Sequence, residues 1–187
     1  MTLFYYYART MDIGTHVATG LVLSTFFDTP EQKTACMIGA VVVDISLIPW
    51  YAYRFAQLHH WKLWRYERQF TGSAPPFCFQ IYHFAHSPVL ILLLGIYFFW
   101  TQSSVGFAFL VGHISHILWD IPSHTGEWAH RPLYPFSDFR IEGFANWWRD
   151  RRLLWCMGVL WIALMIAYIF ILGRNTFRIR GLFGEEF

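Results

Sequence analysis

Residues 105–121 read VGFAFLVGHISHILWDI, an apolar run that carries two histidines and one aspartate. His113, His116 and Asp120 stand at positions i, i+3 and i+7, so they lie on one face of a helix. Burying a charged group in lipid costs about 2.5–3.5 kcal/mol on insertion scales, which makes such residues a functional-site hypothesis. The run therefore predicts a membrane helix with one polar face.

Four further apolar runs flank this one, and they cover Gly14–Phe27, Ala35–Tyr53, Ser87–Trp100 and Leu153–Leu172. A perpendicular span needs about 20 residues, so the first and third runs span only if they include their polar neighbours. Because no segment alternates apolar and polar residues as a strand does, the sequence predicts an all-α fold. We expect an integral membrane helical bundle with about five membrane helices, some short or broken, and an interfacial loop.

The composition is typical of a membrane protein. Of the 187 residues, 56% are hydrophobic and 14% are charged, whereas a soluble domain carries about 25% charged residues. The net charge is only +2 and the arginines are scattered, so membrane lipid rather than nucleic acid is the expected partner. The three cysteines are far apart and form no CxxC motif, which indicates neither a disulfide framework nor a thiolate metal site.

We expect a single membrane domain over residues 1–187. It begins with an N-terminal extension at 1–10, followed by the helices of the site at 11–121. An interfacial loop at 122–152, a last transmembrane helix at 153–173 and a tail at 174–187 complete it. Met1–Arg9 lacks the pattern of a cleavable signal peptide, and Met11 is an alternative start. The loop is too polar to span, and its aromatic residues are typical of a segment lying on the membrane, where it would cover the site. These residues are Trp128, Phe136, Phe139, Phe144, Trp147 and Trp148.

The distribution of lysine and arginine predicts an orientation. If all five runs span, the side with the N-terminus and the two long loops carries ten basic residues: Arg9, Arg54, Lys62, Arg65, Arg68, Arg131, Arg140, Arg149, Arg151 and Arg152. The other side carries four: Lys33, Arg174, Arg178 and Arg180. Because cytoplasmic loops are rich in these residues, we expect a multi-pass protein of the inner (plasma) membrane with the ten-residue side in the cytoplasm.

On this topology the polar residues of several helices reach a similar depth. The first and third helices begin with histidines on the cytoplasmic side, the fourth ends there, and the second contributes an aspartate from below. These residues are His16, Asp44, His83, His86, His116 and Asp120. Unrelated polar residues would not generally agree on side and depth, so we predict a single site. Imidazoles and carboxylates together suit a divalent transition metal.

The order of these residues resembles that of a known family. The motifs are Thr15-His16-x-x-x-Gly20, Asp44, His86-Ser87, Ser115-His116-x-x-x-Asp120, Gly126 and Pro135-Phe136-Ser137. Together they resemble the YdjM-like membrane-bound metal-dependent hydrolases over residues 11–140. The order His, Asp, His and HxxxD is also similar to the metal-ligand order of the helical zinc phospholipase C and single-strand nuclease superfamily.

The resemblance implies a metal-dependent hydrolase, with a phosphoester of a lipid or lipid-linked substrate at the cytoplasmic surface as the expected target. It implies a divalent metal, Zn or Mn, and the following ligands: His16, Asp44, His86, His116 and Asp120. By the same similarity Asp120 would bridge two ions and Asp44 would act as general base. Arg131 and Arg140 are candidates to bind the substrate phosphate through planar guanidinium groups, with cytoplasmic anchors as the alternative role.

The chain also departs from the family pattern. Val43 stands where the family often has proline, and Ile81-Tyr-His-Phe-Ala-His-Ser replaces HRGxTHS. A later HxxxE pair has only loose counterparts in His124 and His130, so one or two ions are expected rather than three. His83, His113 and His124 are expected to support the ligands or to replace one of them.

Other interpretations stay open. The buried His and Asp residues could hydrogen-bond between helices and hold the bundle together, or line an ion or proton path in a transporter. A haem-binding membrane protein would use two facing histidines, which leaves Asp44 and Asp120 unexplained. A histidine-rich di-iron membrane oxygenase would suit nine histidines, but its tight HxxHH clusters are absent from the sequence.

Overall fold

The computed structural model of the chain describes residues 2–48, 76–144 and 150–182. Within these ranges the fold is all-α, as predicted, and an isolated bridge pairs His130 with Ile141. The elements are α1 (Thr2–Ser24), α2 (Pro30–Val42), the 3₁₀ turn η1 (Val43–Leu47), α4 (Pro76–Ala85), α5 (Pro88–Trp100), α6 (Ser104–Ser123), the 3₁₀ turn η3 (Gly126–Trp128) and α7 (Arg151–Leu182).

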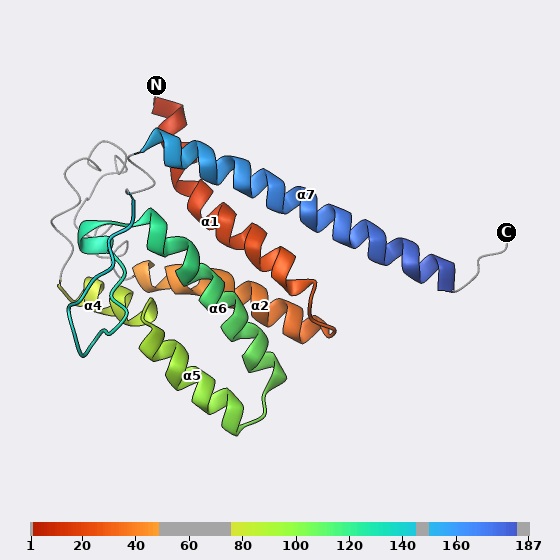
Figure 1. Cartoon of the computed structure of the whole chain (residues 1–187), viewed down its shortest axis with the longest axis horizontal. Coiled ribbons are helices and arrows are strands. Elements are labelled where there is room, and N and C mark those ends of the chain that lie inside the picture. Colours follow the sequence, from red (N-terminus) through yellow and green to blue (C-terminus); the bar gives the residue numbers. More distant parts are fainter. Residues whose placement is uncertain (1, 49–75, 145–149, 183–187) are drawn as a thin grey trace.

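Helix α6 lies at the centre of the bundle, where it contacts α1, α2 and α5, and α7 packs along α1 (Figure 1). The buried residues of α6 include three of the polar residues predicted for the site, His113, His116 and Asp120. The polar face predicted for this helix therefore points into the bundle. Polar groups at membrane depth are tolerated where protein rather than lipid surrounds them.

Glycines bring α2 and α6 together. A Cβ atom at Gly112 of α6 would collide with the carbonyl oxygen of Cys36 on α2, and one at Gly39 would collide with the carbonyl oxygen of Phe109. The two backbones can approach this closely only because neither position has a side chain. Similarly, Gly20 of α1 lies against α2, since a Cβ there would be 2.9 Å from that of Ala40. These approaches draw the residues of three helices toward one another.

Two helices are long and apolar enough to cross a membrane among the described residues, Ser104–Ser123 of α6 and Trp155–Gly173 of α7. A third span would combine Phe79–Ala85 with Pro88–Trp100, which meet at a bend of 50°. The first predicted run yields only a shorter apolar helix at Ile13–Ser24. The expected five spans are thus not confirmed: the described ranges contain two, or up to three if the bent pair is one span, together with the short and broken helices that were expected.

The second apolar run does not continue as one helix. Thr29 caps α2 through a capping box with Gln32, and Pro30 occupies its first turn. The α-helix ends at Val42, and the chain tightens into η1, which carries Asp44. A 3₁₀ turn of this kind often marks a functional position. The part of the predicted run beyond residue 48 lies outside the described residues.

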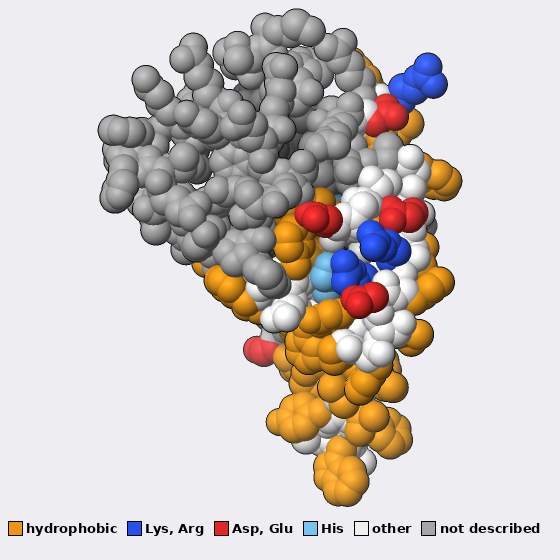
Figure 2. All heavy atoms as spheres, turned by 90° about the vertical axis from the view of Figure 1, so that its left-hand side faces the viewer, with side chains coloured by type: hydrophobic (Ala, Val, Ile, Leu, Met, Phe, Trp, Pro, Cys, Tyr) orange, Lys and Arg blue, Asp and Glu red, His pale blue; other side chains and the backbone are white. Residues whose placement is uncertain are grey.

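The two ends of the molecule differ in surface character. Figure 2 shows the left-hand side of Figure 1, where α4 and the loop after α6 lie. Acidic and basic side chains gather on this face with a histidine among them, whereas the narrow part below is mainly hydrophobic. Helix α5 contributes to the apolar surface with exposed Leu92, Ile96, Phe99 and Trp100. An apolar body with one charged end is the shape expected of a chain held in lipid.

Candidate metal centre

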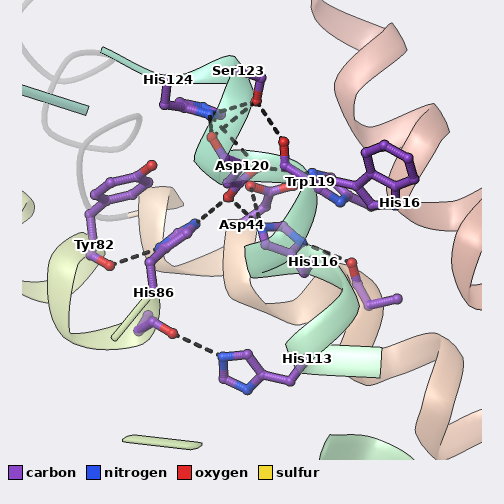
Figure 3. A network of polar contacts seen from close by, with 12 residues as sticks. His16, Asp44, Tyr82, His86, His113, His116, Trp119, Asp120, Ser123 and His124 are labelled. Atoms are coloured by element: carbon purple, nitrogen blue, oxygen red, sulfur yellow. Dashed lines mark hydrogen bonds and ion pairs between the residues drawn. The ribbon is translucent and has the colours of Figure 1, made fainter. Parts of the chain in front are cut away.

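Asp120 stands at the centre of the site (Figure 3). Asp120 is 4% exposed, and three imidazoles approach its carboxylate. Nε2 of His16 lies 3.3 Å from Oδ1, while Nε2 of His86 and Nε2 of His116 lie 3.2 and 3.1 Å from Oδ2. These groups come from α1, the α4–α5 junction and α6, so residues distant in sequence meet at one carboxylate.

Backbone hydrogen bonds define the tautomers of two of these histidines. Nδ1 of His116 donates to the carbonyl oxygen of Ala40 at 2.9 Å, and Nδ1 of His86 donates to that of Tyr82 at 2.8 Å. Because a carbonyl oxygen only accepts, both Nδ1 atoms carry the proton. In the neutral imidazole Nε2 then presents a lone pair, and in both residues it faces Asp120. This is the usual arrangement of a metal-binding histidine, whose other nitrogen is held by a backbone carbonyl.

His16 completes the arrangement from α1. Its ring stacks on that of His116 with centroids 3.7 Å apart and an interplanar angle of 17°. The residue is 1% exposed and His116 is fully buried. A hydrogen bond of 2.9 Å from the Trp119 indole to the Thr19 hydroxyl joins α6 to α1 one turn away. Helix packing and this hydrogen bond therefore position the ring of His16.

Asp44 reaches the same cluster from η1. Its Oδ1 lies 3.7 Å from Nε2 of His116, and its side chain is 21% exposed, compared with 5% for Asp120. The second carboxylate is thus the more accessible of the two. This difference suits Asp44 to a role that involves solvent or substrate, and Asp120 to one that holds the other groups in place.

Two overlapping groups of side chains could hold a metal ion, one formed by His16, His116 and Asp120 and the other by Asp44, His86 and His116. Within each group the ligand atoms lie within 4.8 Å of one another. Ligand atoms on a tetrahedral ion with bonds of about 2.0–2.2 Å lie about 3.3–3.6 Å apart. The measured separations around Asp120 are close to that value, so small side-chain shifts would suffice for coordination.

Several buried polar atoms of the cluster also lack hydrogen bonds. Nε2 of His86, Nε2 of His116 and Oδ1 of Asp120 make none within the described residues. Buried polar atoms are nearly always satisfied, so such a group needs an explanation, and an ion is one that fits this donor set. The structure thus brings together all five residues that the sequence predicts as ligands.

The three expected supporting histidines have different surroundings. His113 donates from Nε2 to the carbonyl oxygen of Ala85 at 2.9 Å, so it ties α6 to the end of α4 beside His86. His124 lies near the centre, with Nδ1 3.1 Å from the Asp120 carbonyl oxygen and 3.8 Å from its Oδ1. His83 faces the loop after α6 and has Tyr134 near its ring, at 5.7 Å between centroids. His113 therefore supports a neighbour of a candidate ligand rather than joining the candidate ligand groups.

The two arginines predicted to bind phosphate are partly engaged. Nη1 of Arg131 donates to Oδ1 of Asp138 at 2.7 Å. Nη1 of Arg140 donates to the Gly126 carbonyl oxygen at 3.3 Å and lies 4.0 Å from Glu142 Oε1. Both arginines lie in the loop that follows α6. Sequence reasoning missed these partners because they come from within the same irregular loop.

That loop contacts the end of α4 and the junction with α5. The Tyr82 hydroxyl donates to the Trp128 carbonyl oxygen at 3.4 Å, and the Ser87 hydroxyl donates to that of Tyr134 at 2.8 Å. The sequence expectation of a loop over the site is compatible with these contacts. Exposed Phe136 and Phe144 lie on the same segment, whereas Trp147 and Trp148 are outside the described residues.

His130 is a buried residue of this loop that sequence reasoning treated only as a loose counterpart of a family motif. It is 5% exposed, and burial lowers its pKa to about 4, so it is neutral at physiological pH. The groups that act on it electrostatically are His86, Asp120 and His124, which places it beside the cluster. Its position in an irregular loop gives no periodicity from which this proximity could be predicted.

Comparisons with protein-family models, with curated proteins and with solved structures find no match to this chain. The resemblance to the YdjM-like hydrolases therefore stays a prediction from the sequence motifs. The functional interpretation depends on the geometry of Asp120 and the four other side chains of the cluster.

Proposed function

We propose that this protein is a membrane-bound metal-dependent hydrolase that acts on a phosphoester at the membrane surface. The observation that carries the proposal is the approach of three imidazole Nε2 atoms to the Asp120 carboxylate at 3.1–3.3 Å. Two of these nitrogens present lone pairs in the neutral tautomer, because their Nδ1 protons are donated to backbone carbonyls. A lone pair and a carboxylate oxygen repel each other unless a proton or a metal cation lies between them.

A metal cation suits this set better than several buried protons. Two or three imidazolium ions packed around one carboxylate would repel one another in a medium of low dielectric constant. One or two divalent ions would instead be neutralised by Asp120 and Asp44 and bound by neutral imidazoles. Zn or Mn accepts this mixture of nitrogen and oxygen ligands. The proposed ligands are His16, Asp44, His86, His116 and Asp120.

The chemistry follows from the ligand types. A bound divalent metal of this kind lowers the pKa of a coordinated water toward neutrality and polarises a phosphoryl oxygen. Asp44, with the more exposed carboxylate, is positioned to accept a proton as general base. Asp120 has two oxygens directed at different imidazoles, which suits a carboxylate that bridges two ions.

The location of the cluster favours a substrate at the membrane surface. It lies near the C-terminal end of α6, a helix long and apolar enough to span, and next to the loop that carries exposed Phe136, Phe139 and Phe144. Aromatic side chains settle at the level of lipid headgroups, where a phosphoester would be within reach. The excess of lysine and arginine in the predicted loops supports a cytoplasmic orientation, most simply in the inner membrane of the cell.

The alternative functions receive less support from the geometry. A haem with two axial histidines needs the rings on opposite sides of a porphyrin, whereas His16 and His116 stack directly on each other. A di-iron oxygenase would use an almost purely histidine set, but carboxylates stand in both candidate ligand groups. An ion or proton transporter remains the runner-up, because a buried His/Asp network can also carry protons.

The decisive experiment measures metal content and hydrolysis together. The full chain is purified in detergent, stripped with a chelator and reloaded with Zn²⁺ or Mn²⁺. We expect bound metal and phosphodiesterase activity on lipid substrates in the wild type, and loss of both in Asp120→Ala. Asp28→Asn, which changes an exposed carboxylate, is the matched control and should retain both. Activity that survives chelation and Asp120→Ala would overturn the proposal, and metal-independent ion flux would favour the transporter.

A further inference from the structure

The buried imidazole of His83 has no role in the metal centre. The residue is 3% exposed and lies on α4, one turn before His86. Its ring packs near Phe79, Tyr82 and Tyr134, with centroids 6.2, 5.3 and 5.7 Å away. Among the described residues its Nε2 makes no hydrogen bond although it is buried. A buried polar atom of this kind indicates a missing partner.

A second side chain with a buried, unsatisfied nitrogen lies in the loop after α6. The side chain of Arg131 is 19% exposed, and its Nη1 is held by the exposed carboxylate of Asp138 at 2.7 Å. Its Nε is buried and makes no hydrogen bond in the described part of the chain. The ion pair thus orients the guanidinium group through Nη1 and does not engage the edge formed by Nε and Nη2. That edge has the spacing to donate two parallel hydrogen bonds to the oxygens of a phosphate.

The surroundings of His83 are positive. Arg131 is the charged group that acts on it most strongly, and Arg140 contributes in the same sense. The imidazoles of His86 and His130 also act on it, and the phenol rings of Tyr82 and Tyr134 lie beside it. Asp138 pairs with Arg131 and Glu142 lies 4.0 Å from Arg140, so acidic side chains balance part of this positive charge. The unsatisfied Nε2 of His83 and the unsatisfied Nε of Arg131 together suit an anionic ligand with several acceptor oxygens.

We propose that Nε2 of His83 and the Nε–Nη2 edge of Arg131 form a binding site for a phosphate group beside the metal centre. Both groups donate hydrogen bonds to the phosphate oxygens, and Asp138 keeps the guanidinium in place. Arg140 adds positive charge at longer range. The metal is not needed for this binding, so the site stands on its own observations.

A role for this phosphate in the reaction rests on the proposed hydrolase function. His83 and His86 are one helical turn apart on α4, so a substrate held at His83 lies next to a proposed metal ligand. The ligand class is a substrate with an anionic phosphate besides the bond that is cleaved, such as a diphosphate. The phosphate could belong to a lipid headgroup or to a soluble molecule, and the experiment separates the two.

The test measures binding of inorganic phosphate to the full chain in detergent after removal of metal, by calorimetry. A charge-assisted hydrogen-bond pair predicts about ten- to hundredfold weaker binding for Arg131→Gln, and a neutral hydrogen bond about three- to tenfold weaker binding for His83→Leu. Arg131→Lys keeps the charge but loses the paired donors, so it should fall between Arg131→Gln and the wild type. The control Arg152→Gln removes an exposed arginine that is not among the groups acting on His83, and it should change the affinity less than twofold.

Circular dichroism and size-exclusion chromatography on each variant separate lost binding from lost folding. The proposal is overturned if the metal-free wild type does not bind phosphate at a phosphate concentration of ~10 mM, which tests for binding at the weak end of the affinity scale. This concentration is about a 100-fold excess over the protein. It is also overturned if folded Arg131→Gln and Arg152→Gln weaken binding equally. Competition by vesicles containing phosphatidic acid would identify a lipid phosphate, and competition by soluble phosphomonoesters alone would identify a soluble one.

Metal content measured on the same preparations keeps this proposal separate from the proposed function. Arg131→Gln should bind Zn²⁺ as the wild type does, because Arg131 is not in either candidate ligand group. Intact metal binding without phosphate binding would overturn only the phosphate site. Phosphate binding in a protein that takes up no Zn²⁺ when it is reloaded would overturn only the hydrolase.

Discussion

Helices α6 and α7 are both long and apolar enough to cross a membrane, yet their surroundings differ. Half of the apolar window in α6 is buried inside the protein, against 6% of the window in α7. Helix α6 carries His113, His116 and Asp120 on its buried side, while Trp155–Gly173 of α7 contains no charged residue. The position of a helix within the bundle, rather than its hydropathy, therefore decides where ionisable groups can lie.

The two helices also differ in how closely a neighbour approaches. Gly112 lets α6 touch the backbone of α2, whereas α7 presents bulky exposed residues such as Val159, Ile162 and Phe170. Close approach of α2 supplies the Ala40 carbonyl that holds His116. Small residues on α6 are thus part of what positions the candidate site, and bulky residues on α7 suit contact with lipid.

The largest effect is expected from a side chain at the α2–α6 contact. In Gly112→Val the new Cβ would meet the Cys36 carbonyl and lie 2.7 Å from the Ala40 nitrogen. Both obstacles are backbone, so α2 must move, and we expect a loss of about 3 kcal/mol or more in unfolding free energy. Denaturant titration in detergent micelles measures it, together with metal affinity, which should fall because the acceptor of His116 moves.

The matched control lies on α7. A Cβ at Gly173 would meet no atom within 4 Å, so Gly173→Val should change the unfolding free energy by no more than about 0.5 kcal/mol. Equal losses in the two variants would show that the close contact between α2 and α6 does not distinguish these helices.

A charge placed on α7 should have the next largest effect. Val159 is 64% exposed and lies within the apolar window. If this helix faces lipid, Val159→Asp costs about 2.5–3.5 kcal/mol of insertion free energy, because the carboxylate finds no partner in hydrocarbon. A glycosylation-based insertion assay of the full chain measures the fraction inserted. Val159→Ser is the uncharged control and should cost clearly less, while normal insertion of the aspartate variant would contradict a lipid-facing α7.

The same contrast explains how much was predictable from the sequence. The helical fold and the shared face of His113, His116 and Asp120 follow from periodicity alone, and the structure confirms both. The number of spans cannot be predicted from periodicity, because α2 changes to a 3₁₀ turn at Val43 and α4 meets α5 at a bend. Both breaks lie inside continuous apolar runs, where hydropathy carries no signal for them.

Depth along the helices predicted a common site for six residues, including His83, and the family resemblance implied five of them as ligands; the structure brings those five together. The sequence did not predict the hydrogen-bond partners of the residues next to this cluster. His113 bonds to the Ala85 carbonyl and Arg140 to that of Gly126, and these partners depend on how the helix ends and the loop fold. The buried position of His130 in that loop likewise has no pattern in the sequence.

Metal should stabilise the α6 side of the molecule by an amount that depends on its concentration. Zn²⁺ at 100 times its dissociation constant would add about 2.7 kcal/mol to the unfolding free energy, since only the folded chain assembles the ligands. We expect chelator-treated protein to melt at a lower temperature and to recover on adding Zn²⁺. His16→Gln should reduce this recovery and Val159→Ser should leave it unchanged. A melting temperature that does not depend on Zn²⁺ would contradict a metal-stabilised cluster.

The smallest effect is expected where α6 is joined to α1 by one hydrogen bond. The Trp119 indole donates to the Thr19 hydroxyl at 2.9 Å, one turn from His16 and next to Asp120. Trp119→Phe keeps an aromatic ring but removes the donor, so we expect a loss of about 1 kcal/mol in unfolding free energy. A double-mutant cycle with Thr19→Val isolates the pair, because the second substitution should cost little once the first has been made. Additive costs would mean that the hydrogen bond does not couple the two helices, and that packing alone holds His16 against His116.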